Sequence, residues 1–257
     1  QRNIPALVAA DKALSLIPNG AAIAVDASAG EAFLSDEPVA NHIQVLRDRI
    51  GEPIIEIKGN VGSVADCKAL AETSASGVGL MRTELLFLNR SSAPTLAEQV
   101  ELYSGVLKEA PKGEVIFRTL DAGSDKPLPY LGLGNEENPS LGVRGFRINS
   151  IDESVLNTQL EALAKAQLNT GRRVSVMAPM IATVEEAAEF AKLAKDAGLE
   201  TIGVMVETPS ICLEIENLAG IVQFVSIGTN DLSQYLFAAD RVNSGVAALL
   251  NPWQPAL

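Results

Sequence analysis

The sequence predicts an α/β fold, a (β/α)₈ TIM-type barrel, and three observations support this prediction. Apolar runs alternate with helical patterns from about residue 53 onward. These runs are continuously apolar rather than alternating, as expected for parallel strands covered on both faces. Charged residues follow nearly every run, whereas a doubly wound sheet would gather them at one switch point. The barrel is therefore favoured over the doubly wound sheet.

Six strands are expected rather than the eight of a closed barrel. The candidate strands are 54–59, 77–83, 115–121, 174–180, 202–208 and 223–229, with helices expected at 95–110, 151–168, 184–197 and 210–219. The barrel is thus expected to lack its last two strands in this chain, which would leave two sheet edges and one side of the core uncovered. Either the sequence is part of a longer protein or a partner covers the gap, and the first explanation is favoured.

The pattern divides the chain into three parts. Residues 1–36 hold short apolar segments broken by turn residues, which indicates the last strands of a small β-containing domain. Residues 37–52 are expected to form a linker helix, because apolar positions there recur with helical spacing and the pattern ends at Gly51. Residues 53–257 would then form the incomplete barrel.

Composition excludes several classes of protein. The chain has 257 residues, 47% hydrophobic, enough for one large core and a small second domain. A formal net charge of −12 argues against nucleic-acid binding, which needs a basic surface. No apolar run reaches membrane-spanning length and no signal peptide is evident. We therefore expect a soluble cytoplasmic protein without membrane insertion.

The single histidine and the two cysteines do not form a recognisable site. His42 is interpreted as a surface residue of the expected linker helix. Cys67 and Cys212 are far apart and show no paired spacing, so neither a disulfide framework nor a zinc site is indicated. Both are interpreted as small buried hydrophobic residues.

Arginines follow the apolar runs. Three strand-like runs end at Arg82, Arg118 and Arg241, and Arg144 follows an Asn-Pro-Ser turn. Because the carboxyl ends of buried strands open into a shared mouth, these arginines are expected to converge there. The planar guanidinium pairs bidentately with phosphate and carboxylate. The sequence therefore predicts a phosphorylated carboxylic acid as the ligand.

Each of these cations also has a structural interpretation. Arg82 could form an ion pair with Glu84 at the end of a strand, and Arg144 could line a helix face with Arg147. Lys126 lies in a polar loop and could reach a phosphate or simply lie on the surface. Its loop lacks the full Gly-x-x-x-x-Gly-Lys pattern, so a P-loop is not supported.

Two carboxylates are delivered at the ends of apolar runs, Glu207 and Asp231. Such a pair suits Mg²⁺, which takes one or two protein oxygens and fills its shell with water and substrate phosphate. The structural alternatives are that Asn230 or Asp231 caps a helix beginning at Leu232, and that Glu207 holds a turn before Pro209. A cap does not need a cationic neighbourhood, so the metal interpretation is preferred.

Six ordered motifs resemble Enzyme I, the phosphoenolpyruvate-protein phosphotransferase of the bacterial sugar phosphotransferase system. They lie at residues 81–87, 94–99, 117–126, 137–144, 206–209 and 226–232, and together span nearly the whole chain. Pyruvate phosphate dikinase and phosphoenolpyruvate synthase share the barrel and the Gly-Thr-Asn-Asp stretch. However, the Arg-Thr-Leu-Asp-Ala-Gly-Ser-Asp-Lys segment at 118–126 looks like Enzyme I instead.

The resemblance implies roles for named residues. Phosphoenolpyruvate would be clamped by Arg82, Arg118, Arg144 and Arg241, with Asn230 and Lys126 assisting, and Mg²⁺ would be held by Glu207 and Asp231. The family reaction passes the phosphoryl group to a histidine of a swivelling domain and then to the carrier protein HPr. Residues 1–36 would be the tail of that swivelling phosphohistidine domain. A homodimer is expected in the intact protein.

Two departures from the family pattern limit what this chain is expected to do alone. The family's phosphohistidine motif lies upstream of residue 1, and His42 does not match it. The cysteine acid that protonates the enolate lies beyond residue 257, and neither Cys67 nor Cys212 occupies its position. No catalytic residue of either kind is therefore assigned. A dikinase- or synthase-like barrel and a non-catalytic phosphoenolpyruvate-sensing relic stay open as alternatives.

The chain alone is expected to bind phosphoenolpyruvate weakly and not to complete the transfer, because the phosphoryl acceptor and the proton donor lie outside it. A single-turnover assay of this chain would measure pyruvate release. Pyruvate formed in stoichiometric amounts would contradict the expectation.

Overall fold

The computed structural model describes residues 16–26, 31–35, 55–123, 128–132, 134 and 136–257. The chain divides into two compact units, which we call the hairpin unit (Gln1–Pro53 with Asp240–Ala248) and the sheet unit (Ile54–Ala239 with Leu249–Leu257). In the hairpin unit, β1 (Ile23–Asp26) and β2 (Glu31–Leu34) pair antiparallel. The expected linker helix at 37–52 lies outside the described residues.

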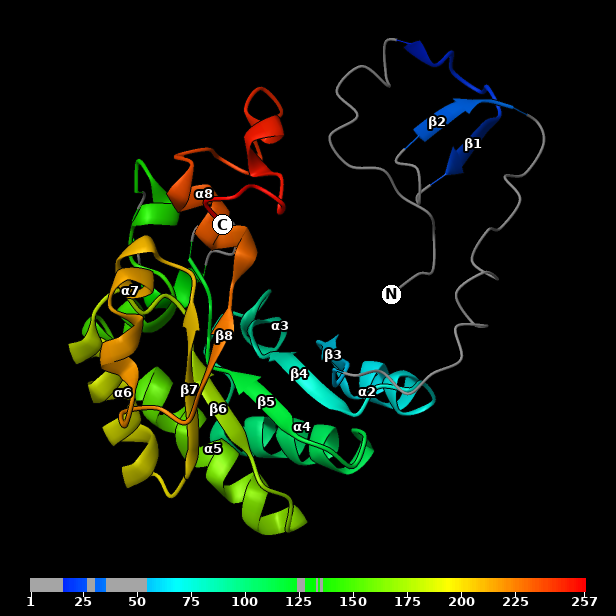
Figure 1. The fold of residues 1–257 in the computed structure, drawn as a ribbon. Coiled ribbons are helices and arrows are strands. Elements are labelled where there is room, and N and C mark those ends of the chain that lie inside the picture. The colour runs from blue at the N-terminus through cyan, green and yellow to red at the C-terminus, as the bar shows by residue number, and fades with distance from the viewer. Residues whose placement is uncertain (1–15, 27–30, 36–54, 124–127, 133, 135) are drawn as a thin grey trace. The chain divides into compact units, whose positions relative to one another are not determined.

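The sheet unit is built on a six-stranded parallel sheet that curls into a half-barrel (Figure 1). Its strands are β3 (Lys58–Val61), β4 (Gly77–Arg82), β5 (Val115–Arg118), β6 (Ser175–Ala178), β7 (Thr201–Val206) and β8 (Phe224–Ile227). They lie side by side in sequence order, and every neighbouring pair is parallel. The predicted α/β class and the number of six parallel strands are therefore confirmed. Each strand is shorter than expected, and the first lies at Lys58–Val61 rather than at 54–59.

Helices connect the strands. They are α2 (Val64–Ala71), α3 (Glu84–Phe87), α4 (Leu96–Glu109), α5 (Glu153–Thr170), α6 (Val184–Asp196), α7 (Pro209–Leu213) and α8 (Thr229–Leu236). Short 3₁₀ helices lie at Pro129–Leu131, Pro139–Leu141, Gly145–Ser150, Ile215–Leu218 and Ala247–Leu250. In the described part of the chain, none of the helices has both the length and the apolar character that a membrane span requires.

The three long helices agree with the prediction, and local capping explains where they begin. Thr95 and Glu98 form a capping box at α4, and Thr183 and Glu186 form one at α6. One prediction was wrong in detail, because the helix expected at 210–219 is split into α7 and a 3₁₀ helix. The short helices α2 and α3 were not predicted.

The apolar run before Arg241 is not a strand, so that prediction was wrong. Helix α8 ends at Leu236, and residues 237–241 form a turn and an irregular segment. Ala238 has a positive φ of 49°, which no regular strand residue adopts. The apolar composition of the segment reflects a helix terminus rather than a buried strand.

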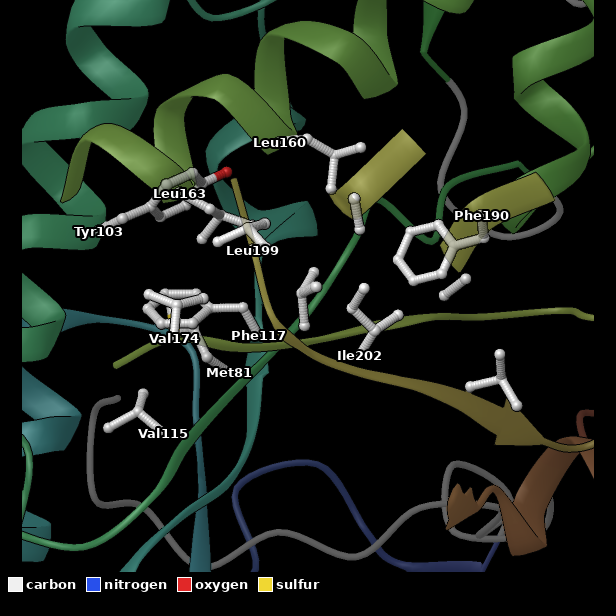
Figure 2. Close-up of a cluster of buried hydrophobic side chains, with 14 of the residues drawn as sticks. Met81, Tyr103, Val115, Phe117, Leu160, Leu163, Val174, Phe190, Leu199 and Ile202 are labelled. Carbon is white, nitrogen blue, oxygen red and sulfur yellow. The ribbon is translucent and has the colours of Figure 1, made fainter. Parts of the chain in front are cut away.

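The main core lies between the sheet and the helices α4, α5 and α6 (Figure 2). Tyr103 of α4 meets Phe117 of β5 edge to face, with ring centroids 5.4 Å apart. Phe146 and Phe190 form a second such pair at 5.9 Å. Central strands β5 and β6 are buried along their whole length. Dense packing of this kind fixes the ends of the strands, where the charged residues lie.

Strand β8 is one of the two edge strands of the described sheet, the other being β3. Among the described residues it pairs with β7 on one side and with no strand on the other. Val225 is 43% exposed and Ile227 is 66% exposed, in contrast to the buried central strands. The expected uncovered side of the half-barrel is therefore present in the described structure.

One arginine ties the end of α4 to the start of β6. Arg172 donates hydrogen bonds to four backbone carbonyls, those of Leu107, Ala110, Pro111 and Gly113, at 2.5–3.0 Å. These carbonyls lie at the end of α4 and in the loop before β5, where helix and turn carbonyls lack intrahelical partners. The adjacent Arg173 is exposed, and its Nη2 atom lies 4.0 Å from Glu200 Oε2.

Replacing Arg172 with methionine should lower the free energy of unfolding by about 1–3 kcal/mol, because four carbonyls lose a charged donor. Replacing Arg173 with methionine should change it by less than about 0.5 kcal/mol, because exposed ion pairs contribute little. Denaturant unfolding of both variants gives the comparison. Equal losses in the two variants would contradict the assigned role of Arg172.

Candidate functional site

The charged residues gather where the parallel strands end. Arg118 is the last residue of β5, Glu207 directly follows β7, and Asp231 lies in the first turn of α8 after β8. The carboxyl ends of parallel strands share one edge of the sheet, so these side chains approach one another. All three are buried.

A bridging carboxylate, Asp121, joins two guanidinium groups. Arg118 Nη1 lies 3.1 Å from Asp121 Oδ2, and Arg144 Nη2 donates to both Asp121 oxygens at 3.1 and 3.2 Å. On its other side Arg118 Nη2 donates to Glu84 Oε1 at 2.8 Å. Buried charges are tolerated only when opposite charges and hydrogen bonds compensate them, and this alternation does so.

Arg144 continues the chain of charges to Asp231. Its Nη1 and Nη2 donate to the two oxygens of Asp231 at 3.1 and 3.3 Å, the bidentate geometry of a guanidinium fork. Nη1 also donates to the hydroxyl of Tyr235 at 3.2 Å. Burial alone would lower the pKa of Arg144, but Asp121 and Asp231 outweigh it and raise that pKa well above its usual value. Arg144 is therefore always charged.

The same balance holds for Arg118. Its side chain is only 8% exposed, and burial would lower its pKa. The carboxylates of Asp121, Glu84 and Glu207 outweigh burial and raise the pKa of Arg118. Its Nε atom is buried and has no hydrogen-bond partner among the described residues. The site thus contains a fixed positive charge with one donor still unsatisfied.

Glu207 is 1% exposed, and its carboxyl group has a shifted pKa. Its pKa is raised to about 7, first by burial and then by the negative charges of Asp121 and Asp231, while the Met180 N–H and Arg118 act in the opposite direction. The Met180 N–H donates to Glu207 Oε1 at 2.7 Å. At neutral pH this carboxyl group is therefore poised to take up a proton or a further cation.

Two backbone features hold the Glu207 carboxylate in place. Met180 has a positive φ of 59°, a strained conformation for a residue with a side chain, and it directs its N–H to Glu207. A Cβ atom at Gly228 would lie 2.6 Å from Glu207 Oε2 and 2.7 Å from Glu207 Cβ. Only glycine leaves room there for the carboxylate.

The acids fit a divalent cation that completes its shell with ligand oxygens. Within the described residues, no group of three or more His, Cys, Asp and Glu side chains could hold a metal ion by itself. Glu207 and Asp231 offer hard oxygen donors after neighbouring strands, and the pKa of Glu207 is raised first by burial and then by the negative charges of Asp121 and Asp231. Mg²⁺ characteristically uses one or two carboxylates together with water and phosphate oxygens.

The structure brings together four of the eight residues predicted to form the site, namely Arg118, Arg144, Glu207 and Asp231. Arg82 ends β4 and is exposed. Asn230 is exposed in the first turn of α8. Arg241 is exposed and belongs to the hairpin unit, and Lys126 lies outside the described residues. The ligand-binding and metal-binding roles of all eight residues stay predictions.

The structural alternatives are resolved for several residues. The N-cap of α8 is Gly228, so the alternative that Asn230 or Asp231 caps a helix beginning at Leu232 was wrong. The Arg144 guanidinium enters the buried cluster rather than lining a helix face, whereas Arg147 donates to two backbone carbonyls.

Glu84 also has a different role from the predicted ion pair with Arg82. It is buried and accepts a hydrogen bond from Arg118, the arginine at the end of the neighbouring strand. Only the pairing of β4 with β5 brings these two residues together.

The sequence reasoning missed three contributors to the site. Asp121 was noticed only as part of a polar loop, although its position three residues after Arg118 is a usable signal. Tyr235 contacts Arg144 through its hydroxyl, which also donates to the Ser140 carbonyl. Met180 acts through its backbone N–H, for which no side-chain pattern exists.

The raised pKa of Glu207 predicts how stability depends on pH. A carboxyl group with a folded-state pKa near 7 and an unfolded pKa near 4.5 binds more protons when folded, so the stability that it contributes is lost as pH rises through about 7. Relative to wild type, Glu207→Gln should therefore gain about 1–3 kcal/mol between pH 5 and pH 8 in chelator-treated protein. Denaturant unfolding at several pH values measures this. A pH-independent difference would contradict it.

Comparison with known proteins agrees with this chemistry. The family described as "PEP-utilising enzyme, PEP-binding domain" matches residues 50–257, which include every residue of the cluster. The chain is 43% identical to the phosphoenolpyruvate-protein phosphotransferase of Streptomyces coelicolor, over 99% of this chain and 49% of that protein. It is 38% identical to the protein of the same name from Haloferax volcanii, with the same coverage of both chains.

A third relative has a different name. The multiphosphoryl transfer protein of Rhodobacter capsulatus is 41% identical over 79% of this chain and 25% of its own length. The chain thus spans about half the length of the phosphotransferases that it matches, and a smaller share of this third protein. On the match over residues 50–257, the chain belongs to the family of PEP-utilising enzymes, as its PEP-binding domain.

Proposed function

We propose that this chain supplies the phosphoenolpyruvate site of a phosphoenolpyruvate-protein phosphotransferase. The observation that carries the proposal is the buried cluster in which Arg118 and Arg144, joined by Asp121, face Glu207 and Asp231 at one end of the parallel sheet. Relatives that align with 99% of this chain carry that name. The ligand has a phosphate and a carboxylate, and each is a good partner for a guanidinium fork.

Arg118 and Arg144 would bind the ligand either by giving up some of their hydrogen bonds to carboxylates or by adding hydrogen bonds to the ligand. The unsatisfied Nε of Arg118 is a donor that an anionic ligand could use, and satisfying a buried polar group recovers roughly 1–3 kcal/mol. The Asp121 carboxylate keeps both guanidinium groups oriented, so little reorganisation is needed when the anion binds. The proposed set of ligand-binding residues is completed by Arg82, Arg241, Asn230 and Lys126.

Glu207 and Asp231 are the proposed Mg²⁺ ligands. When bound, the ion would neutralise charge on the phosphate. The protein's own contribution is the anionic pair, held by the Met180 N–H on Glu207 and by the Arg144 fork on Asp231. Deprotonation of Glu207 is required for metal binding, so cation affinity should rise as pH passes about 7.

The proposed chemistry demands positioning and charge neutralisation more than covalent catalysis by this chain. Phosphoryl transfer spreads charge over the phosphate oxygens, and fixed guanidinium groups stabilise that charge without reorganising. Neither cysteine is suited to protonate the product enolate. Cys67 is fully buried in α2, and burial raises its pKa to about 11. Cys212 lies in α7 and packs against the main core, and burial raises its pKa as well.

The remaining parts of the proposal concern the intact protein. The half-barrel would be part of an eight-stranded TIM-type barrel, as the unbroken parallel order of six strands suggests. Residues 1–36 would belong to a swivelling phosphohistidine domain, and residues 37–52 to a linker helix. An HPr-type carrier would receive the phosphoryl group, in a cytoplasmic homodimer.

Calorimetric titration of the protein with phosphoenolpyruvate tests the site. We expect binding that Mg²⁺ strengthens, a loss of at least about 100-fold in affinity for Arg118→Ala, and loss of the Mg²⁺ effect for Glu207→Ala. Arg118→Lys should recover part of the affinity, because it restores the charge without the fork.

Arg173→Ala serves as the matched control, because this arginine is exposed and lies at the other end of the sheet, before β6. It should bind phosphoenolpyruvate as wild type does. Wild-type affinity in a folded Arg118→Ala variant would refute the proposed site.

A further inference from the structure

The side chain of Gln159 joins three elements beneath the site. It lies on α5 and is fully buried. Its Oε1 accepts from the Leu120 N–H at 2.8 Å, and its Nε2 donates to Thr83 Oγ1 and to the Tyr103 hydroxyl, both at 3.0 Å. A buried amide with both donor hydrogens used and its oxygen bonded is costly to replace, because each lost partner leaves a buried polar group unsatisfied.

Two of these hydrogen bonds fix the short segment that carries the site. The Leu120 N–H lies between Arg118 and Asp121 in the chain, and Gln159 holds it directly. Thr83 receives a hydrogen bond from Gln159 and donates its own hydroxyl to the Arg118 carbonyl at 2.8 Å. One side chain therefore anchors the backbone on both sides of residue 119.

Beyond the end of β5, two other backbone hydrogen bonds of this segment are found among the described residues. The Thr119 N–H donates to the Met177 carbonyl at 2.9 Å, and the Ala122 carbonyl accepts from the Gly145 N–H at 3.4 Å. The next residues must turn so that Asp121 can reach both Arg118 and Arg144. The contacts of Gln159 are made at the positions where this turn begins.

The third hydrogen bond of Gln159 leads away from the site. Tyr103 donates its hydroxyl to Gln99 Oε1 at 3.1 Å, and Gln99 donates to the Pro94 carbonyl at 3.1 Å. This branch stabilises α4 and the loop before it. Tyr103→Phe therefore removes a hydrogen bond of the same length from Gln159 while leaving both contacts to the 118–121 segment.

We propose that Gln159 is a positioning residue for the ligand site: it sets the placement of Arg118 and Asp121 without touching the ligand. The identity of the ligand, phosphoenolpyruvate, rests on the proposed function. The role of Gln159 in placing the 118–121 segment does not depend on that function. Displacing binding groups by about 1 Å can cost on the order of 100-fold in a positioned reaction. A residue that controls the turn between two charged groups can therefore control affinity from a distance.

The test compares three variants in the intact protein. Gln159→Met keeps the side-chain volume and removes all three hydrogen bonds of Gln159. Thr83→Val removes two hydrogen bonds, the one that Thr83 donates to the Arg118 carbonyl and the one that it accepts from Gln159. Tyr103→Phe is the matched control. Two measurements are made on each. Amide hydrogen exchange of peptides covering residues 115–123 reports the placement of the segment, and calorimetry reports phosphoenolpyruvate affinity in Mg²⁺.

We expect Gln159→Met to speed exchange in the 118–121 segment and to weaken phosphoenolpyruvate binding by about 10- to 100-fold. Thr83→Val should also speed exchange and weaken phosphoenolpyruvate binding, but by less than Gln159→Met does. Tyr103→Phe should lower the melting temperature and leave both measurements at their wild-type values. A folded Gln159→Met variant with wild-type exchange in this segment would overturn the proposal.

Other outcomes separate the two proposals. Equal losses of affinity in Tyr103→Phe and Gln159→Met would overturn the positioning role, because general core stability would then explain both. If wild type binds no phosphoenolpyruvate, the proposed function fails and the exchange measurement alone decides the role of Gln159. If Gln159→Met does not fold, Thr83→Val decides it, with unchanged exchange at residues 118–121 counting against the proposal.

Discussion

The site depends on one carboxylate that two guanidinium groups share. Asp121 is 4% exposed and contacts Arg118 and Arg144 at 3.1–3.2 Å. Without this negative charge, two buried cations would lie near each other and neither could keep its place. With it, Glu84 and Asp231 extend the alternation of charge on either side. The order of the strands makes the arrangement possible, because it delivers these groups from β4, β5 and β8 to one edge.

The fold supplies rigidity where the charges need it. Tyr103 of α4 packs against Phe117 of β5, and the strands leading to Arg118 and Glu207 are almost fully buried. Charged groups on such strand ends reorganise little when a ligand arrives, which is the physical basis of electrostatic preorganisation. The strained backbone at Met180 fits this view, since its unusual conformation directs a donor at the Glu207 carboxylate.

Sequence reasoning located the elements better than it located their partners. Continuous apolar runs identify buried parallel strands, so Arg118 and Glu207 were placed correctly at strand ends. The pairing of Arg118 with Glu84 depends on the register between two strands, which the local pattern does not contain. The strand-like run before Arg241 shows a different limit, because a short apolar segment after a helix can resemble a buried strand in composition.

Gly228 has no side chain, yet it restricts which residues can occupy its position next to the site. Even a methyl group there would overlap the Glu207 carboxylate, at 2.6 Å from Oε2. The clash includes the Cβ of Glu207 at 2.7 Å, so a change of rotamer at Glu207 cannot relieve it. A side chain at position 228 is therefore incompatible with the observed placement of Glu207. Mutant libraries that aim at new substrates can therefore keep glycine at position 228 and vary other positions.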